Sequence, residues 1–376
     1  MTLRFWIISF AAVFFWSCSS PDRPRQHSRS ANHYALGFEI SVQNGIRRLT
    51  VKNPWEQARN VAINYYLVDK NQPVPDSLAG KKIIRTPVER IVCLSTSHLA
   101  FLEALGEDQA VTGISGAGYI SSPFIRQAVD EGRVVDVGYG QNLNYEEIIR
   151  QAPDAVMVYG VDSEITGFLR KFEDLGIPAI MNAEYLEETP LGKAEWIRFV
   201  GALFNKEALA DSLFRETESR YQQLTELARQ ASPRPAVLVG LPYRDSWWVP
   251  GGRSYLAHLI EDAGGNYSGR DNPSHESYVI SFEEALTRAA TADIWLNVGM
   301  VSSKAEILAA DARFANFPVF RNGRIFNNNQ VSTEMGGNDF WESGTVHPDR
   351  ILSDLIQLFH PGLLPPAELF YYKEIK

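Results

Sequence analysis

The pattern of apolar and polar positions first indicates β structure near the N-terminus. Residues 38–42 alternate apolar and polar side chains, Asn44-Gly45 offers a tight turn, and residues 46–51 run back. This combination predicts a β-hairpin. Residues 61–68 predict a third strand, and residues 71–82 predict a loop.

From residue 90 the pattern changes to short apolar runs that alternate with helical stretches, which is typical of a parallel α/β fold. A long helical stretch is predicted at 192–229, with breaks at Gly201 and Asn205, and a last helix at 348–359. Before this stretch, strands are predicted at 90–94, 111–114, 134–137, 155–159 and 179–181. After it, strands are predicted at 236–241, 247–249 and 294–298, and a helix is predicted at 254–263.

A sequence echo relates the two halves. Asn144-Tyr145-Glu146-Glu147 recurs as Ser281-Phe282-Glu283-Glu284, a separation of 282 − 145 = 137 residues, and each copy runs into an Asp-led apolar strand. The predicted fold class is therefore α/β, with two Rossmann-like lobes joined by a long helix and an N-terminal β-hairpin extension. The expected division is a signal peptide at 1–17, a tether at 18–33, a β extension at 34–84, lobe 1 at 85–190, linker helices at 191–231 and lobe 2 at 232–376.

The net charge and the N-terminal sequence limit the classes of function that the chain can have. Lys and Arg number 36 against 45 Asp and Glu, a net charge of −9, which argues against a nucleic-acid binder because phosphate recognition needs surplus cations. The N-terminus carries Arg4, an apolar run at 5–16 and then Ser17-Cys18. This resembles a bacterial lipoprotein signal with Cys18 lipidated; the alternative is an ordinary cleaved signal with an incidental cysteine.

The echoed helix starts combine structure and candidate chemistry. Asn144 and Ser281 are good N-cap residues, and Glu147 and Glu284 stand three positions later, where a capping carboxylate reaches back. Glu146 and Glu283 are not needed for capping. They either stabilise the first turn through the helix dipole or bind arginines of a two-fold symmetric partner.

Several motifs together resemble the substrate-binding proteins of ABC importers for metal chelates, which handle ferric siderophores, haem and cobalamin. The motifs stand in the same order across about 85–361, namely Arg90-Ile91-Val92, Glu103-Ala104-Leu105-Gly106, Val111-Thr112-Gly113, residues 142–154, Pro250-Gly251-Gly252, residues 259–265, Ser281-Phe282-Glu283, residues 322–326, residues 347–352 and His360-Pro361.

The resemblance implies an inter-lobe ligand cleft, no catalysis and no cofactor. It also implies docking of Glu146 and Glu283 on a permease dimer. Two features depart from the family pattern: the second echo lacks the Pro-Asp that Pro153-Asp154 supplies in the first, and the N-terminal hairpin lies outside the common core.

Loops after the predicted strands supply the candidate ligand contacts, because aromatic rings and arginines suit a large flat or globular chelate. These candidates are His98, Tyr119, Tyr139, Tyr159, Tyr243, Arg244, Trp247, Arg253 and Trp341. Trp248 is predicted to be a strand core residue. Arg244 and Arg253 suit an anionic ligand.

Three other functions compete with this interpretation. A binder of free zinc or manganese needs clustered ligands, whereas the seven His are scattered along the chain. A hydrolase needs a nucleophile elbow, and residues 113–118 approach G-x-S-x-G but carry Ala117 in place of the last glycine. A surface adhesin would use the hairpin to hold a receptor. The preferred prediction is an exported, lipid-anchored binding protein at the periplasm or cell surface.

Overall fold

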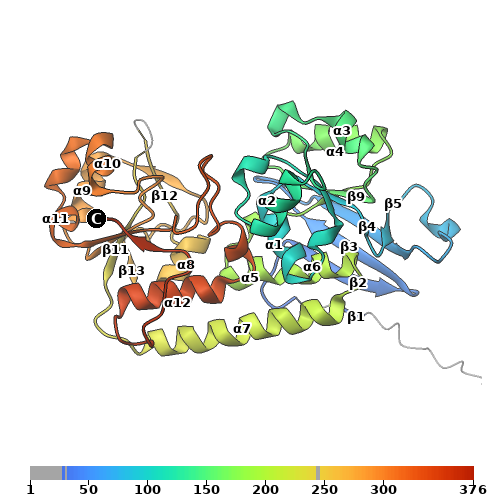
Figure 1. The fold of residues 1–376 in the computed structure, drawn as a ribbon. Coiled ribbons are helices and arrows are strands. Elements are labelled where there is room, and N and C mark those ends of the chain that lie inside the picture. Colours follow the sequence, from blue (N-terminus) through green and yellow to red (C-terminus); the bar gives the residue numbers. More distant parts are fainter. Residues whose placement is uncertain (1–27, 30–31, 243–245) are drawn as a thin grey trace, which may run out of the picture.

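The computed structural model describes residues 28–29, 32–242 and 246–376. In this part of the chain the strands form three five-stranded sheets and one two-stranded ribbon. Figure 1 shows two α/β halves side by side, with one long helix running beneath both and the N-terminal sheet against one half. Cys18, the predicted lipidation site, lies outside the described residues, as do the predicted signal peptide and most of the tether.

The N-terminal region folds into a sheet that is larger than a hairpin. Its strands lie in the order β1-β2-β3-β4-β5, with all pairs antiparallel except β4–β5. The predicted hairpin is confirmed, since Asn44 and Gly45 turn the chain with positive φ angles of 52° and 78°. The strands are β1 (Ser28–Arg29), β2 (Phe38–Gln43), β3 (Ile46–Lys52), β4 (Ala62–Asp69) and β5 (Lys82–Thr86).

Two buried glutamates anchor the segment before β2 to the rest of the molecule. The Glu195 carboxylate accepts hydrogen bonds from the backbone N–H groups of residues 33–35 at 2.8–3.0 Å. The Glu187 carboxylate accepts from those of Leu36 and Gly37, at 3.0 and 2.8 Å. Because unpaired buried carboxylates are costly, these contacts make the N-terminal sheet part of the same folded body.

Lobe 1 is a parallel sheet in the order β10-β9-β6-β7-β8. Its strands are β6 (Ile91–Cys93), β7 (Val111–Ile114), β8 (Val135–Asp136), β9 (Ala155–Val158) and β10 (Ala179–Met181). Its helices are α1 (Thr96–Ala104), α2 (Pro123–Asp130), α3 (Tyr145–Arg150) and α4 (Ile165–Asp174). The buried strands match the predicted apolar runs, because strands covered on both faces read as continuous hydrophobic segments.

Lobe 2 has the order β13-β11-β15-β16-β17, parallel except for the last pair. The sheet strands are β11 (Ala236–Val239), β13 (Asn266–Tyr267), β15 (Ile294–Leu296), β16 (Arg324–Asn327) and β17 (Lys373–Glu374), and β12 (Trp247–Val249) pairs with β14 (Tyr278–Ile280) as a ribbon. The helices are α8 (Tyr255–Asp262), α9 (Phe282–Ala289), α10 (Lys304–Ala310), α11 (Pro318–Asn322) and α12 (Pro348–Phe359).

Both sheets reverse their strand order near the centre, between β6 and β9 in lobe 1 and between β11 and β15 in lobe 2. Doubly wound sheets leave a crevice at such a point, outside the carboxyl ends of the strands. The echoed aspartates before β9 and β15 have the same structural task. Asp154 accepts from the backbone N–H of Arg90 at 3.1 Å, and Asp293 from that of Ala236 at 2.8 Å.

The linker contains three helices, α5 (Pro190–Glu195), α6 (Ile197–Leu203) and α7 (Glu207–Arg229). Asn205 breaks the helical run with a φ of 56°, as predicted. The predicted break at Gly201 is wrong: Gly201 lies within α6, where a Cβ would meet that of Ala210 at 2.6 Å, so the glycine allows close packing of α6 on α7.

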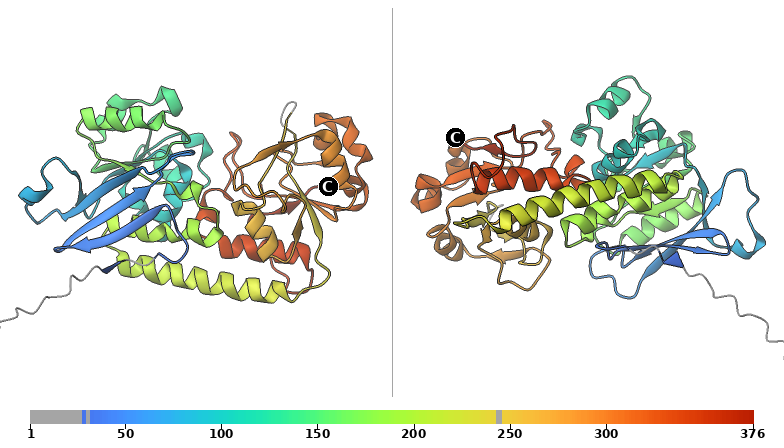
Figure 2. Two further views of the ribbon diagram at one scale, coloured as in Figure 1. Left: turned by 180° about the vertical axis from the view of Figure 1, so that it is seen from behind. Right: turned by 90° about the horizontal axis from the view of Figure 1, so that it is seen from below.

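The helix α7 reaches across both halves of the molecule, as the view from below in Figure 2 shows. Its 23 residues correspond to a rod of about 35 Å. Toward its far end Tyr221 donates a 2.6 Å hydrogen bond to Asp262 of α8. Among the described residues, no helix has the length and apolarity that a membrane crossing requires.

Candidate functional site: the inter-lobe cleft

A cleft of about 650 Å³ lies between the lobes. Its lining comes from three parts of the chain, which are the β10–α5 segment (Tyr185, Leu186, Glu187 and Glu188) with Lys193, lobe 2 (Val239, Trp248, Pro250, Tyr255, Asn297 and Trp341 among others), and Glu56 of the β3–β4 loop. Val239 ends β11 and Asn297 follows β15. The cleft is thus at the crevice that the strand order of lobe 2 creates.

Lobe 1 has its own pocket of about 200 Å³ at the carboxyl ends of β6, β7 and β9. Leu94, Ser115, Tyr139 and Tyr159 are among its lining residues. Burial, reinforced by the neighbouring Tyr139, raises the pKa of Tyr159 to about 12. The Tyr159 hydroxyl therefore stays protonated at neutral pH and can donate a hydrogen bond to a ligand.

Contacts between the lobes flank the cleft. Arg253 of lobe 2 forms a 2.9 Å ion pair with Glu188, and His275 Nδ1 lies 3.5 Å from the same carboxylate. Elsewhere, Glu342 accepts hydrogen bonds at 2.8 and 2.7 Å from the backbone N–H groups of Ser121 and Ser122 at the start of α2. Burial raises the pKa of Glu342 to about 7.

The β3–β4 loop, residues 53–61, lies beside the cleft. The Glu56 N–H donates a 3.0 Å hydrogen bond to the Val161 carbonyl of lobe 1. Three non-glycine residues of this loop, Asn53, Gln57 and Asn60, have φ angles of 44°, 61° and 58°. Such left-handed conformations persist where surrounding contacts hold them, so the loop has a defined shape.

The structure brings some of the predicted ligand residues together. Tyr139 and Tyr159 line the lobe 1 pocket, and the Tyr119 ring lies 5.7 Å from that of Tyr139. Trp341 lines the inter-lobe cleft, and Arg253 lies at its edge in the ion pair with Glu188. Two further candidates, Tyr243 and Arg244, lie outside the described residues.

The structure does not bring His98 or Trp247 to the cleft. His98 is completely buried, and its ring contacts Tyr159 edge-on at 6.4 Å. Trp247 is 2% exposed and stacks on Trp295 and Phe317 in the lobe 2 core.

The assignment of Trp248 to the core is wrong, because its side chain is 55% exposed and lines the cleft. Side chains of a strand point alternately to its two faces. The apolar run that predicts β12 does not reveal which of its two adjacent tryptophans faces inward.

Sequence reasoning missed Lys193, Tyr255, Glu188 and Asn297, all of which line the cleft. Asn297 falls within the predicted strand 294–298, whereas the observed strand β15 ends at Leu296, so the prediction placed Asn297 inside the sheet. Lys193 had no usable signal, because a lysine in a helical stretch is usually solvent-exposed.

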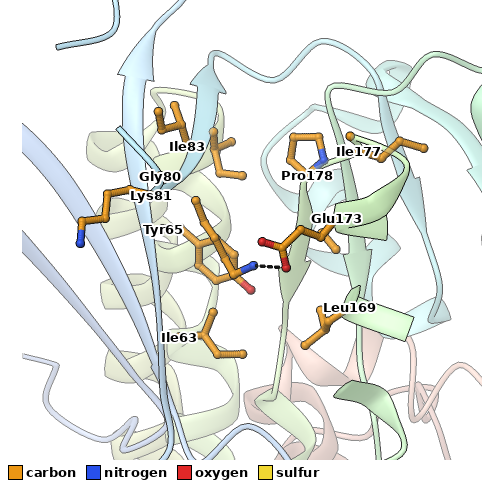
Figure 3. Close-up of a pocket in the computed structure, with 13 residues that line it drawn as sticks. Ile63, Tyr65, Gly80, Lys81, Ile83, Leu169, Glu173, Ile177 and Pro178 are labelled. Carbon is orange, nitrogen blue, oxygen red and sulfur yellow. Dashed lines mark hydrogen bonds and ion pairs between the residues drawn. The ribbon is translucent and has the colours of Figure 1, made fainter. Parts of the chain in front are cut away.

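A third hollow, of about 310 Å³, separates the N-terminal sheet from lobe 1 (Figure 3). Ile63 and Tyr65 line one side and Leu169 and Ile177 the other, and a 3.2 Å ion pair joins Lys82 to Glu173. This hollow lies at the amino end of β10, opposite the carboxyl-end crevice, so it is separate from the inter-lobe cleft.

Glu146 and Glu283 are both exposed in the first turns of α3 and α9. Their neighbours differ from the predicted capping box in one respect. Asn144 and Ser281 accept the expected hydrogen bonds from the Glu147 and Glu284 N–H groups, at 3.0 and 3.1 Å, but the Glu147 and Glu284 carboxylates pair with Arg150 and Arg288 along their own helices. Within the described part of the chain, neither the Glu146 nor the Glu283 carboxylate has a hydrogen-bond or ion-pair partner.

The described residues contain no group of three or more His, Cys, Asp or Glu side chains placed to hold a metal ion. Cys93, which lies in β6, is fully buried, and burial raises the pKa of its thiol. The cleft is lined by aromatic rings, amide groups and charged side chains that do not form such a group.

Comparison with known proteins identifies the family. Residues 91–330 match the periplasmic binding protein family. The chain belongs to this family. Periplasmic binding proteins bind solutes and are not enzymes, and the match begins at the first residue of β6, which leaves the N-terminal sheet outside it.

Two uncharacterised lipoproteins of Methanocaldococcus jannaschii are similar to this periplasmic binding protein. One is 28% identical over 312 residues, which is 79% of this chain and 72% of the relative. The other is 27% identical over 337 residues, which is 85% of this chain and 82% of the relative.

Solved structures share the fold. A possible iron-binding periplasmic solute-binding protein of Staphylococcus epidermidis has a TM-score of 0.57 at 20% identity, covering 73% of this chain and 100% of its own. The periplasmic haem-binding protein HutB of Vibrio cholerae has a TM-score of 0.56 at 18% identity, covering 72% and 99%. The vitamin B12 binding protein BtuF of Vibrio cholerae has a TM-score of 0.53 at 15% identity, covering 73% and 97%.

Proposed function

We propose that this periplasmic binding protein captures a metal chelate, such as a ferric siderophore, haem or cobalamin, and delivers it to the permease of an ABC importer. The observation that carries the proposal is the inter-lobe cleft. Its volume of about 650 Å³ is in the range of small-molecule sites, and it receives Trp248, Tyr255 and Trp341 from one lobe and Tyr185 from the other side.

The chemistry of the lining supports a chelate over a bare ion. Aromatic rings offer large flat contact surfaces, which suit a macrocycle or a wrapped siderophore. Bare zinc needs three or four N, S or O ligands in close geometry, and the described residues offer no such group. The solved proteins with this fold include ones described as iron-binding, haem-binding and vitamin B12 binding.

The proposed delivery uses Glu146 and Glu283 as docking residues for arginines of the permease dimer. Figure 1 shows α3 at the top of one half and α9 in the outer part of the other, both away from α7. We also propose that Cys18 carries a lipid anchor that holds the exported protein at the membrane surface. Two similar proteins are named lipoproteins, which supports this anchor.

A titration tests the proposal. The mature chain from residue 18, with Cys18→Ser to keep it free of lipid, is titrated with haemin, cyanocobalamin and several ferric siderophores while tryptophan fluorescence is recorded. We expect one class to bind with a Kd of about 1 μM or below. Stoichiometric binding of Zn²⁺ or Mn²⁺ alone, with no chelate bound, would replace this function by free metal-ion capture.

A further inference from the structure

Lys193 is a charged side chain on a helix that is buried along its whole length. The side chain lines the cleft, yet the residue is only 8% exposed. Its ammonium lies 5.1 Å from the ring centroid of Tyr255 and 5.5 Å from that of Trp341. An ammonium in such a place has lost most of its hydration, which is costly unless other groups compensate it.

The compensation that the protein itself provides is incomplete. Within the described residues, the Lys193 ammonium has no hydrogen-bond acceptor and no carboxylate within 4.0 Å. Burial lowers the pKa of Lys193, and Glu184 opposes this shift from a greater distance. Glu184 Oε1 accepts a 2.6 Å hydrogen bond from Ser97, and Glu184 Oε2 has no hydrogen-bond partner among the described residues. Glu184 thus offsets the Lys193 charge from beyond ion-pair distance and does not accept a hydrogen bond from its ammonium.

The two rings attract the cation through their faces but are not strong hydrogen-bond acceptors. The three N–H donors of the ammonium therefore have no acceptor among the described residues, and the side chain lines the cleft. A ligand that supplies an acceptor, above all an anionic one, would complete this arrangement.

The other charges of the cleft limit where an anion can bind. Glu188 forms an ion pair with Arg253 and lies 3.5 Å from His275 Nδ1, and Glu187 accepts hydrogen bonds from backbone N–H groups. Glu56 and Glu276 are exposed and carry negative charge at the side of the cleft lined by the β3–β4 loop. Among the described lining residues, Lys193 is the one lysine or arginine, and no carboxylate lies within 4.0 Å of its ammonium.

We propose that Lys193 binds an anionic group of the ligand, a carboxylate or a phosphate, and selects chelates that carry one. The anionic group lies against Lys193 between Tyr255 and Trp341, and the neutral or cationic remainder of the chelate lies toward Glu56 and Glu276. This inference rests on the proposed function, since it names which chelates the cleft prefers.

Matched pairs of chelates test the inference in the mature chain. Haemin is compared with haemin dimethyl ester, which lacks free carboxylates. Cobalamin is compared with cobinamide, which lacks the phosphodiester, and a ferric citrate-hydroxamate is compared with a neutral ferric trihydroxamate. The first and third pairs report on a carboxylate and the second on a phosphate. For the pair that binds, we expect the anionic member to bind at least about tenfold more tightly.

Variants then locate the preference. Lys193→Met should remove it, and Lys193→Arg should retain most of it. The matched control is Lys171→Met, because the Lys171 ammonium lies 5.8 Å from the Tyr145 ring on the outside of lobe 1. Lys193→Met removes the positive charge that offsets the buried Glu184 carboxylate. The double variant with Glu184→Gln is therefore measured too, and thermal unfolding confirms that the variants fold.

The outcomes separate the two proposals. If the neutral member of a bound pair binds as tightly as the anionic one, or if the folded Lys193→Met variants keep the preference, Lys193 does not select an anion and the chelate-binding function stands. If no chelate of any pair binds to the wild-type protein, the proposed function fails and this inference fails with it.

Discussion

Two buried ionisable side chains, His98 on α1 and Lys193 on α5, differ in what surrounds them. Neither ring nitrogen of His98 has a hydrogen-bond partner, and burial holds its pKa down, to about 3. The imidazole is therefore a neutral core group. Lys193 is nearly as buried, at 8% exposed, but lines a cleft large enough for a ligand. At the residue scale, the open volume beside a buried polar group distinguishes a site from a core.

The buried state of His98 predicts a pH-dependent stability. In the unfolded chain His98 takes up a proton below its ordinary pKa of 6.5, while in the folded protein it stays neutral down to about 3. Protonation of His98 in the unfolded chain therefore lowers the free energy of unfolding as the pH falls from 6.5 toward 3. Above pH 6.5 this effect is absent. At pH 5 the loss amounts to about 2 kcal/mol.

The His98→Leu variant should therefore lose less thermal stability than the wild type between pH 7.5 and pH 5, as measured by circular dichroism. Other titrating groups act equally in both proteins, so the difference isolates His98. We also expect the variant to keep its chelate affinity, because His98 lines neither pocket. Equal pH dependence of the two proteins would contradict the buried neutral state.

Sequence reasoning succeeds where a local pattern decides the outcome. The strands β7 and β10 begin and end at the predicted residues, because short segments with apolar residues at their ends, between turns and helices, mark the buried strands of a parallel sheet. The sequence pattern predicts neither β5, whose first residue Lys82 ends the predicted loop, nor the two-residue strands β13 and β17. These strands depend on pairing with partners distant in the chain.

The same dependence on contacts distant in the chain decides which site residues can be predicted from the sequence. Tyr159 follows a well-marked strand and was found, whereas Lys193 is buried only because α5 packs between the two lobes. For Trp247 and Trp248 the pattern established the strand but not its orientation, and a shift of one residue moves a side chain to the opposite face.

At the scale of elements, the β3–β4 loop brings the N-terminal sheet to the ligand cleft. Its base is closed by a 2.8 Å hydrogen bond from the Asn53 N–H to the Val61 carbonyl, and its tip is held by the bond from Glu56 to Val161. The family match begins only at residue 91, so this loop lies outside the matched region. We infer that the loop contributes to ligand selection.

Shortening this loop should weaken ligand binding. Replacing residues 54–60 by two glycines removes Glu56, the residue of this loop that lines the cleft, and we expect the affinity for the bound chelate to fall by about tenfold. The control shortens the exposed segment 73–77 before β5, which lines neither pocket of the site. Affinity is measured by fluorescence titration. An unchanged Kd in the first variant would show that the loop only covers the surface.

At the scale of the whole molecule, two lobes with different strand orders present matching first-turn carboxylates. Lobe 1 uses the order β10-β9-β6-β7-β8 and lobe 2 the order β13-β11-β15-β16-β17, yet Glu146 and Glu283 are both exposed at the start of a helix. The rod-like α7 supports both lobes from one side, so the distance between the two carboxylates is held by the fold. A symmetric receptor can use such a fixed spacing.

The docking proposal predicts a separation of uptake from binding. The double variant Glu146→Ala with Glu283→Ala should abolish uptake of labelled chelate by cells that express the permease, while the Kd of the purified protein stays unchanged. The matched control is Glu147→Ala with Glu284→Ala, since these neighbouring carboxylates pair with Arg150 and Arg288 on their own helices. Loss of chelate affinity in the first double variant would refute the docking role.

The anchoring of the N-terminal segment by Glu187 and Glu195 bears on how this chain can diverge. Five backbone donors from residues 33–37 satisfy two carboxylates that the linker keeps away from water. A descendant that lost the first sheet would leave Glu195 with Arg198 and Glu187 with the Trp196 N–H as their remaining partners, which would leave each buried carboxylate less well compensated. We therefore expect loss of those residues in evolution to be accompanied by replacement of the two acids. The N-terminal extension and the linker region would then change together.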